Sequence, residues 1–327
     1  MKGRHKAVIQ NSRLHYEFEF KRNISVIRGD SATGKTTLIN MLRQYENLGN
    51  SSGVDISCDV PCRVLEGREW KMILHTISSS LIFIDEENSF IGTEEFASEA
   101  KKSDNYFILI TRENLYNLPY SVEEIYGLKS SGRYQNTRQV YQQTYRIYPN
   151  TRRLPVEPEK LIVEDSNAGF DFFSSVCREA GIECVSSRGK SNLARYLLSP
   201  ANTSADGRIT TCIIADGAAI GPEMNLLYEA AAGNENLSLY LPESFEWLIL
   251  KSGIIDGNAV QSILSEPEEY IDSSEFFSWE RFFTHLLSEG TKDSYLKYDK
   301  RKLNPAYLYK KIKSAILGQI KGIRFPT

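Results

Sequence analysis

One stretch decides how the N-terminal part of this chain folds: ISVIRGDSATGKTTLINMLRQY, residues 24–45. Its first six residues are a short apolar run that ends in glycine, which predicts a buried β-strand over Ile24–Gly29. The run TTLINMLRQY predicts a helix that starts near Lys35. Between them lies GDSATGKT, Gly29 to Thr36. It matches the pattern G-x-x-x-x-G-K-[ST] in the strand–loop–helix context that this pattern requires; the alternative is a chance match on a surface loop.

Each residue type in this loop has a physical role in binding a nucleoside triphosphate. Glycines let the backbone fold around the phosphates with its N–H groups pointing inward, and the helix N-terminus adds the positive end of its dipole. We expect Lys35 to reach the β- and γ-phosphates, and Thr36 to place its hydroxyl on Mg²⁺. The sequence therefore predicts ATP and Mg²⁺ as cofactors, bound by nine residues of the loop: Gly29, Asp30, Ser31, Ala32, Thr33, Gly34, Lys35, Thr36 and Thr37.

Two further apolar runs end in polar residues that would complete this site. SLIFID ends at Asp85, which we expect to hold the magnesium through water, while Glu86 orients or deprotonates the attacking water. The alternative is an exposed acidic turn, because the polar run continues after Glu86. NYFILIT ends at Thr111, which we expect beside the γ-phosphate as a sensor, with a plain strand-end cap as an equal alternative. The predicted catalytic residues are Lys35, Glu86 and Thr111.

These elements belong to an α/β domain predicted over residues 1–148. Further strands are expected at Lys6–Gln10, Leu14–Phe20 and Cys62–Gly67. Apolar strands that alternate with helices imply a parallel sheet covered on both faces. The two phosphate-site motifs resemble those of the ATPase domains of the ABC and AAA-like P-loop families, which implies a P-loop NTPase fold and ATP hydrolysis. An LSGGQ-like signature is missing, which puts ABC-style dimer closure in doubt.

A second α/β domain is predicted over residues 161–255, after a proline-rich linker at 149–160. Its expected strands are Leu161–Asp165, IECVSS, Thr210–Asp216 and Leu237–Leu241, separated by helical runs. Residues 256–327 are expected to form a helical C-terminal extension, because their apolar residues recur at helical spacing.

Acidic side chains follow the strands of this second domain. Glu164 and Asp216 lie at strand ends and Glu246 comes just after a third strand, so the three can converge on a cation at one edge of the sheet. They resemble a Toprim domain, the magnesium-binding fold of topoisomerases, primases and overcoming-lysogenization-defect nucleases. The resemblance implies Mg²⁺ ligands at all three positions. Ala218 replaces the second Asp of the family's D-x-D-x-x-G pattern; Asp165 or Glu223 could substitute for it. The alternative is a generic α/β domain with solvated acids.

Charge is distributed unevenly along the chain. Residues 151–287 carry 10 basic and 21 acidic side chains, whereas residues 288–327 carry 10 basic and 3 acidic ones. The basic tail contains YLKYDKRKLNPAYLYKK, which mixes lysines and an arginine with four tyrosines, a composition that suits phosphate contact and base stacking. The simpler alternative is a helix that packs its apolar residues on the core and leaves its lysines in water.

Several classes of protein are excluded by what the sequence lacks. No apolar run is long enough to span a bilayer and none resembles a signal peptide, so we expect a cytoplasmic protein without a membrane partner. The five scattered cysteines argue against a disulfide framework. A guanine-specific N-K-x-D stretch is not evident, which counts against a GTPase.

The pairing of a P-loop ATPase with a Toprim-like domain resembles bacterial proteins of nucleic-acid defence and of mobile elements. It implies a Mg²⁺-dependent ATPase that serves a nucleic-acid-linked process, such as phage defence or mobile-element maintenance. An ATP-gated nuclease is the first alternative, and a nucleotide-switch adaptor or small-molecule kinase is the second. The expected partners are nucleic acid through the tail, a protein effector, or further copies of the chain.

Overall fold

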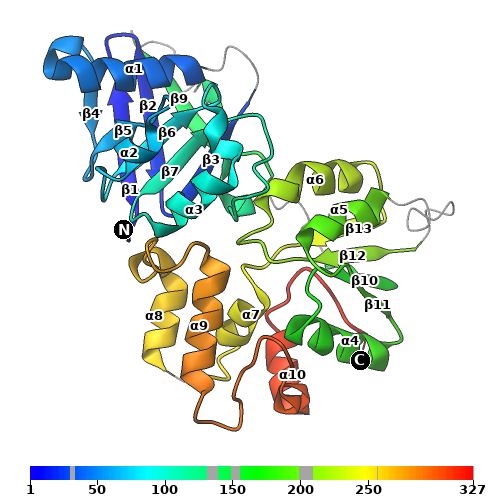
Figure 1. Cartoon of the computed structure of the whole chain (residues 1–327). Coiled ribbons are helices and arrows are strands. Elements are labelled where there is room, and N and C mark those ends of the chain that lie inside the picture. Colours follow the sequence, from blue (N-terminus) through cyan, green and yellow to red (C-terminus); the bar gives the residue numbers. More distant parts are fainter. Residues whose placement is uncertain (30–33, 131–138, 149–154, 199–208, 256, 327) are drawn as a thin grey trace. The chain divides into compact units, whose positions relative to one another are not determined.

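The computed structural model describes residues 1–29, 34–130, 139–148, 155–198, 209–255 and 257–326 (Figure 1). The chain divides into two compact units. Unit 1 comprises Met1–Pro149 and Glu266–Ser278, and unit 2 comprises Asn150–Ser265 and Trp279–Thr327. Each unit combines helices with a β-sheet, which confirms the predicted mixed α/β class.

Unit 1 is built on a nine-stranded sheet with the order β4-β1-β2-β9-β8-β3-β7-β6-β5. The neighbours from β8 to β5 are all parallel, as predicted for the strands around the phosphate loop. The sheet is mixed, however, because β1 runs antiparallel to β2 and β4, and β9 antiparallel to β8. The strands are β1 (His5–Gln10), β2 (Leu14–Phe20), β3 (Ile24–Arg28), β4 (Asp55–Ser57), β5 (Cys62–Val64), β6 (Leu81–Asp85), β7 (Tyr106–Ile110), β8 (Ile125–Ser130) and β9 (Val140–Arg146).

The burial of these strands follows their sequence patterns. Every residue of β3, β6 and β7 is buried, as expected for continuous apolar runs covered on both faces. Strand β2 instead alternates, with Tyr16, Phe18 and Phe20 buried and Glu17 and Glu19 exposed. The predicted half-buried strand is therefore confirmed.

Helices cover the two faces of this sheet. Helix α1 (Lys35–Leu48) buries Leu38 in a core that also contains Ile108 of β7. The neighbouring Phe107 points to the other face, because successive side chains of a strand alternate, and it packs edge-to-face on Phe96 with ring centroids 5.5 Å apart. Phe96 belongs to α3 (Glu94–Lys102), so α1 and α3 lie on opposite faces. Helix α2 (Trp70–Leu74) lies beside α3, because Trp70 packs on Phe96 with ring centroids 5.7 Å apart.

A segment from late in the chain completes unit 1. The carbonyl of Glu268 accepts a hydrogen bond from Gly3 N–H at 2.8 Å, and its carboxylate forms an ion pair with Arg4. The N-terminal ammonium lies 2.9 Å from Asp272 Oδ1. Residues 266–278 are thereby fixed to the start of β1.

Unit 2 contains a four-stranded sheet in which all neighbours are parallel, with the order β11-β10-β12-β13. All four strands were predicted, each within two residues of its observed ends. They are β10 (Lys160–Val163), β11 (Glu183–Ser186), β12 (Thr211–Ile214) and β13 (Leu237–Tyr240). The helices are α4 (Ala168–Ala180), α5 (Lys190–Leu198), α6 (Met224–Ala232), α7 (Phe245–Lys251), α8 (Asn258–Ser265), α9 (Trp279–Thr291) and α10 (Lys310–Leu317).

The C-terminal part of unit 2 contains the helices α9 and α10. Helix α10 buries Ile312 and Ile316 and exposes Lys310 and Lys311, the arrangement of an amphipathic helix that packs on a core. Short 3₁₀ turns occur at Gly49–Ser52, Ser89–Gly92, Val122–Glu124, Gly221–Glu223, Pro267–Glu269 and Pro305–Leu308.

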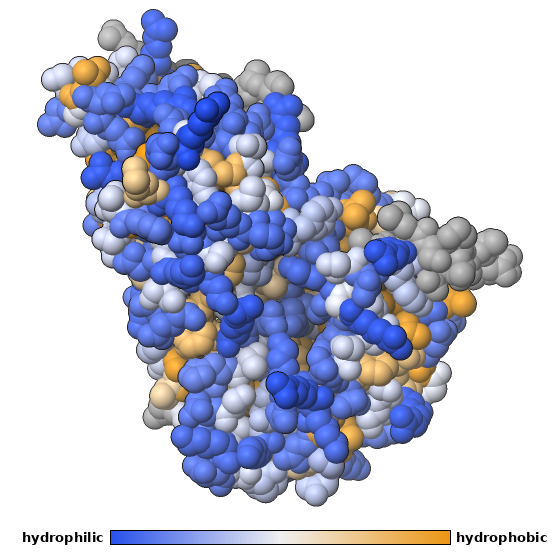
Figure 2. All heavy atoms as spheres, in the orientation of Figure 1, coloured by the Kyte–Doolittle hydropathy of each residue, from blue (hydrophilic) through white to orange (hydrophobic). Residues whose placement is uncertain are grey.

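The surface in Figure 2 is mostly hydrophilic, with scattered hydrophobic patches. Within the described ranges, none of the helices has the length and apolar character needed to cross a membrane.

Candidate functional site

Three parallel strands of unit 1 end at the same level. In the sheet register Ile27 of β3 lies opposite Ile110 of β7, and Ile110 lies opposite Asp85 of β6. The residues that follow these positions leave the sheet at one carboxyl edge, where parallel α/β sheets open into a crevice. The predicted phosphate loop, Thr111 and Glu86 are therefore brought to one edge.

The two ends of the predicted phosphate loop, Gly29 and Lys35, are close together. Lys35 is 7% exposed, and its ammonium donates a hydrogen bond to the Gly29 carbonyl at 2.5 Å, across the mouth of the loop. Thr36 and Thr37 are exposed in the first turn of α1. Gly34 precedes this turn and carries no side chain to cap the first amides of the helix. The predicted ligands Asp30, Ser31, Ala32 and Thr33 lie outside the described residues.

Strand β2 supports the C-terminal end of the loop. Gly34 has a φ of 86°, and a Cβ at this position would lie only 2.8 Å from the Tyr16 hydroxyl oxygen. That hydroxyl donates a hydrogen bond to the Gly34 carbonyl at 2.8 Å. Burial raises the pKa of Tyr16 to about 12, so the hydroxyl keeps its proton at neutral pH. Tyr16 fixes the peptide from which the helix begins, a role the sequence analysis missed.

The acidic side of this edge combines one buried and one exposed carboxylate. Asp85 is 5% exposed and accepts a hydrogen bond from the Glu86 N–H at 2.7 Å. Glu86 is exposed, and its Oε2 lies 3.7 Å from Nε of Arg112. Thr111 is buried, and its hydroxyl oxygen accepts a hydrogen bond from the Glu113 N–H at 3.0 Å. Its position matches a sensor or a turn cap equally well.

Arg28, the last residue of β3, connects the loop to the segment after β7. The buried guanidinium donates hydrogen bonds to Asn114 Oδ1 at 2.8 Å and to the Tyr120 hydroxyl at 2.9 Å. The segment that follows Thr111 is thereby tied to the last residue before the predicted phosphate loop. Sequence reasoning missed Arg28 because an arginine that ends an apolar run reads as a surface residue.

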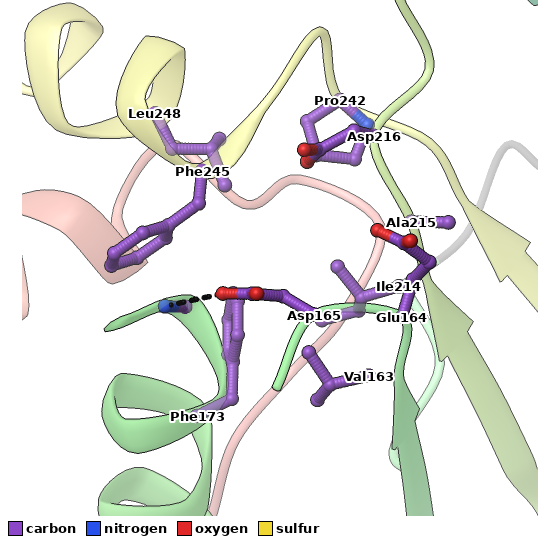
Figure 3. Close-up of a pocket in the computed structure, with 11 residues that line it drawn as sticks. Val163, Glu164, Asp165, Phe173, Ile214, Ala215, Asp216, Pro242, Phe245 and Leu248 are labelled. Atoms are coloured by element: carbon purple, nitrogen blue, oxygen red, sulfur yellow. Dashed lines mark hydrogen bonds between the residues drawn. The ribbon is translucent and has the colours of Figure 1, made fainter. Parts of the chain in front are cut away.

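A second cluster of polar side chains lies at the carboxyl edge of the unit 2 sheet. Val163 of β10 lies opposite Ile214 of β12, so Glu164 and Asp216 follow at neighbouring strand ends, as predicted. Their carboxylates and that of Asp165 surround the same opening (Figure 3). This pocket has a volume of about 10 Å³, which is space for roughly one water molecule.

The carboxylate of Asp165 is hydrogen-bonded to backbone amides that follow it in the sequence. It accepts hydrogen bonds from the N–H groups of Ser166 at 2.7 Å and Asn167 at 3.0 Å. It also accepts one from the N–H of Gly169 at 2.8 Å, drawn as a dashed line in Figure 3. Ser166 and Asn167 lie in the turn before α4 and Gly169 lies in its first turn, so Asp165 stabilises the start of that helix. The backbone passes close to Leu241 at Gly217. A Cβ at this position would lie only 2.6 Å from the Leu241 carbonyl oxygen.

Glu246, the third predicted acid, is 2% exposed in the first turn of α7. It accepts a hydrogen bond from the Tyr298 hydroxyl at 2.7 Å, and its Oε1 lies 4.0 Å from Lys300 Nζ. The Lys300 ammonium also forms an ion pair with Glu280 of α9. A lysine from the C-terminal segment thus lies between acids of two other elements, α7 and α9.

The pKa shifts show that these groups act on one another. Burial, then the charges of Glu280 and Asp165, raise the pKa of Glu164 to about 7. Burial, then the charges of Glu280, Glu164 and Glu246, also raise the pKa of Asp216 well above its usual value. Burial alone would lower the pKa of Lys300, but the nearby carboxylates raise it, so this lysine is a permanent cation.

The acids at this edge of the sheet fit the ammonium group of Lys300 better than they fit Mg²⁺. Lys300 already supplies a positive charge to Glu280 and Glu246, and the Tyr298 hydroxyl uses one carboxylate oxygen of Glu246. Ala218, which stands where the Toprim pattern has an acid, is buried. Among the residues that the structure describes, no three His, Cys, Asp or Glu side chains are grouped closely enough to hold a metal ion.

The sequence analysis missed Glu280, Tyr298 and Lys300. Glu280 sits in an amphipathic helix and Lys300 in a run of basic residues, and both patterns are typical of solvated positions.

Comparison of the chain with protein families, with characterised proteins and with solved structures finds no match.

Proposed function

We propose that unit 1 binds ATP with Mg²⁺ and hydrolyses it, and that the protein serves a nucleic-acid-linked process such as phage defence or mobile-element maintenance. One observation carries the ATPase proposal: the register that brings the ends of β3, β7 and β6 to one level. Lys35, Thr36, Thr111, Asp85 and Glu86 then belong to a single edge. A lysine, an uncapped helix N-terminus, a hydroxyl and a buried carboxylate form a donor set suited to a magnesium triphosphate.

Each residue has a separate task in this proposal. The Lys35 ammonium, now on the Gly29 carbonyl, moves to the β- and γ-phosphates, and the first amides of α1 donate to phosphate oxygens. Thr36 and Asp85 hold Mg²⁺, which neutralises charge on the phosphates when bound. Glu86 is exposed and orients or deprotonates the attacking water. The protein segment after Thr111, fixed through Arg28, is positioned to respond to the γ-phosphate.

Paired variants test this proposal. Lys35→Ala should abolish ATP binding measured by calorimetry, because the phosphates lose their main cation. Glu86→Gln should retain ATP binding and lose phosphate release, because an amide cannot accept the proton of the attacking water. Lys101→Ala, an exposed cation on α3 of the same unit, is the matched control and should change neither quantity. Unchanged turnover in Lys35→Ala would refute the phosphate-loop assignment.

The convergence of Glu164, Asp216 and Glu246 at one edge of unit 2 is the observation that favours a second candidate, an ATP-gated metal-dependent nuclease. The presence of Lys300 among these acids makes it the weaker proposal. Nicking of a plasmid with Mg²⁺ or Mn²⁺ separates the two. Cleavage by the wild type that is lost in Glu164→Ala would establish the nuclease. A nucleotide-switch adaptor would instead bind ATP with no turnover, and a small-molecule kinase would transfer the phosphate to an acceptor other than water.

The cytoplasm is the compartment in which we place this activity, because ATP and nucleic acid are both present there. A protein effector or further copies of the chain are the proposed protein partners. Co-purification of the tagged full-length chain, followed by mass measurement of the intact assembly with and without ATP, tests both.

A further inference from the structure

The C-terminal segment of unit 2 has an unusual balance of charge. Between residues 294 and 313 there are seven Lys or Arg side chains and one Asp, in a chain whose net charge is −3. Five of the seven cations are exposed. Within the described part of the chain, these five side chains have no hydrogen-bond or ion-pair partner: Lys297, Arg301, Lys302, Lys310 and Lys311.

The four tyrosines of the segment divide into two pairs. Tyr298 and Tyr307 are buried, and their hydroxyls donate hydrogen bonds to Glu246 and to the Leu296 carbonyl. Tyr295 and Tyr309 are 70% and 61% exposed. An exposed tyrosine leaves a large apolar ring in water, and two of them lie among the exposed cations.

Specific hydrogen bonds hold the two parts of this surface side by side. The Asn304 amide donates to the carbonyls of Tyr295 at 2.9 Å and Lys297 at 3.1 Å, and its carbonyl oxygen accepts from Ala306 N–H at 3.0 Å. The stretch that carries Tyr295 and Lys297 is thereby joined to the turn that leads to Tyr309 and α10 (Figure 1).

Contacts with the rest of unit 2 also hold this segment in place. The Lys300 carbonyl accepts a hydrogen bond from Ala168 N–H at 3.1 Å, and the side chains of Tyr298 and Lys300 contact the acid cluster. Lys297 and Arg301, on either side of these anchors, stay exposed. The surface is therefore pre-arranged, and a ligand would not have to order it.

We propose that this surface, formed by the five exposed cations with Tyr295 and Tyr309, binds single-stranded nucleic acid. Cations without protein partners suit phosphates, whose binding releases counterions. Exposed aromatic rings suit the faces of unpaired bases, which a duplex keeps stacked. The inference deepens the proposed nucleic-acid-linked function by naming the partner and the surface that binds it.

Fluorescence anisotropy with a labelled 20-nucleotide strand tests the proposal on the full-length chain without ATP. DNA and RNA strands of the same sequence distinguish the two sources of the ligand, and a duplex of the same length measures the preference for unpaired bases. We expect the single strand to bind at least tenfold more tightly than the duplex. Each of Tyr295→Ser and Tyr309→Ser should weaken strand binding by about tenfold, since stacking contributes to every bound base.

The charge component has a matched control. Arg301→Gln/Lys302→Gln removes two positive charges from the surface, and Arg63→Gln/Lys101→Gln removes one Arg and one Lys from exposed positions of unit 1. The first variant should reduce the slope of log affinity against log salt by about 1.4, because each lost phosphate contact on a single strand removes about 0.7. The unit 1 variant should leave the slope unchanged.

Four outcomes overturn the proposal: no binding by the wild type, equal loss in both double variants, equal affinity for duplex and strand, or full competition by poly-glutamate, which would indicate an acidic protein partner. The same measurements in the Lys35→Ala background separate this proposal from the ATPase. Strand binding by that variant supports the surface even if ATP binding is absent from the wild type. If the wild type hydrolyses ATP but does not bind the strand, the proposed nucleic-acid surface is refuted and the ATPase proposal is not.

Discussion

Replacing Lys300 with methionine tests whether an internal lysine takes the place of a metal ion in unit 2. The change keeps the length of the side chain and removes its charge. Lys300 Nζ contacts Glu280 and lies 4.0 Å from Glu246 Oε1. Two charges at about 4 Å attract by roughly 4 kcal/mol in a medium with an effective dielectric constant of about 20, before the cost of desolvation.

The expected loss of stability is smaller than this Coulomb energy. Removing one partner of a fully buried ion pair costs about 3–5 kcal/mol. The Lys300 side chain is 39% exposed, so water screens part of its interaction, and we expect a loss of about 2 kcal/mol. For a unit of this size, such a loss lowers the melting temperature by about 4–8 °C. Thermal unfolding followed by circular dichroism measures this shift.

The pH dependence of Lys300→Met provides a second readout. The folded-state pKa of Glu164 is raised to about 7, above its unfolded value near 4.5. Its contribution to stability is therefore fully present below about pH 4.5 and is lost as the pH rises through about 7. Without Lys300 the ionised acids lose one of the cations that stabilise their charged form. We expect the variant to differ most from the wild type above pH 7 and least below pH 5.

Divalent cations should distinguish this explanation from simple loss of packing. Millimolar Mn²⁺ without nucleotide should raise the melting temperature of Lys300→Met in the Lys35→Ala background, because a bound cation replaces the missing charge. It should not do so for the matched Lys35→Ala protein with Lys300 intact. Lys300→Arg keeps the charge, and Lys297→Met changes an exposed lysine; both should match the wild type. Equal stabilisation by Mn²⁺ with and without Lys300 would refute the reasoning.

Two smaller perturbations test other parts of the structure. Tyr16→Phe removes the hydrogen bond to the Gly34 carbonyl and should weaken ATP binding by about 1 kcal/mol, or roughly fivefold in calorimetry, whereas Tyr106→Phe should have no effect; equal affinities for Tyr16→Phe and wild type would contradict a role in shaping the loop. Glu223 is buried, and burial raises its pKa to about 6, so its ionisation opposes folding as the pH rises from about 4.5 through 6. Glu223→Gln should therefore stabilise unit 2 by about 2 kcal/mol at pH 8 and not at pH 4 in urea unfolding, and the same gain at both pH values would be evidence against this interpretation.

Hydrophobic pattern was sufficient to predict the strands that position both sites. Strands β3, β6, β7 and β12 come from short, largely apolar runs. Such runs are typical of strands in a parallel sheet that is covered on both faces. Strand β9 was missed for the opposite reason. VYQQTYR is largely polar and only Gln142 of its seven residues is buried, so its pairing depends on neighbours that come from elsewhere in the chain.

The site residues also differ in whether their positions could be predicted from the local sequence. Strand ends converge because of the sheet itself, so Asp85, Thr111, Glu164 and Asp216 could be assigned to two edges from their position after apolar runs. Lys300 and Tyr298 reach the second edge through the path of the C-terminal segment, which is set by contacts such as the hydrogen bond from Ala168 N–H to the Lys300 carbonyl. Tertiary contacts of this kind have no local sequence signal.

The two roles of the C-terminal segment depend on each other through charge. The acids at the edge of the unit 2 sheet would repel a polynucleotide, because phosphates and carboxylates carry the same sign. Lys300 neutralises part of this charge from within, while Lys297 and Arg301, on the same segment, face water. An acidic edge that holds its own cation is compatible with a nucleic-acid surface next to it in a way that an uncompensated acid cluster is not. Loss of Lys300 should therefore weaken strand binding although this side chain contacts carboxylates and not the strand, and unchanged strand affinity in Lys300→Met would separate the two roles.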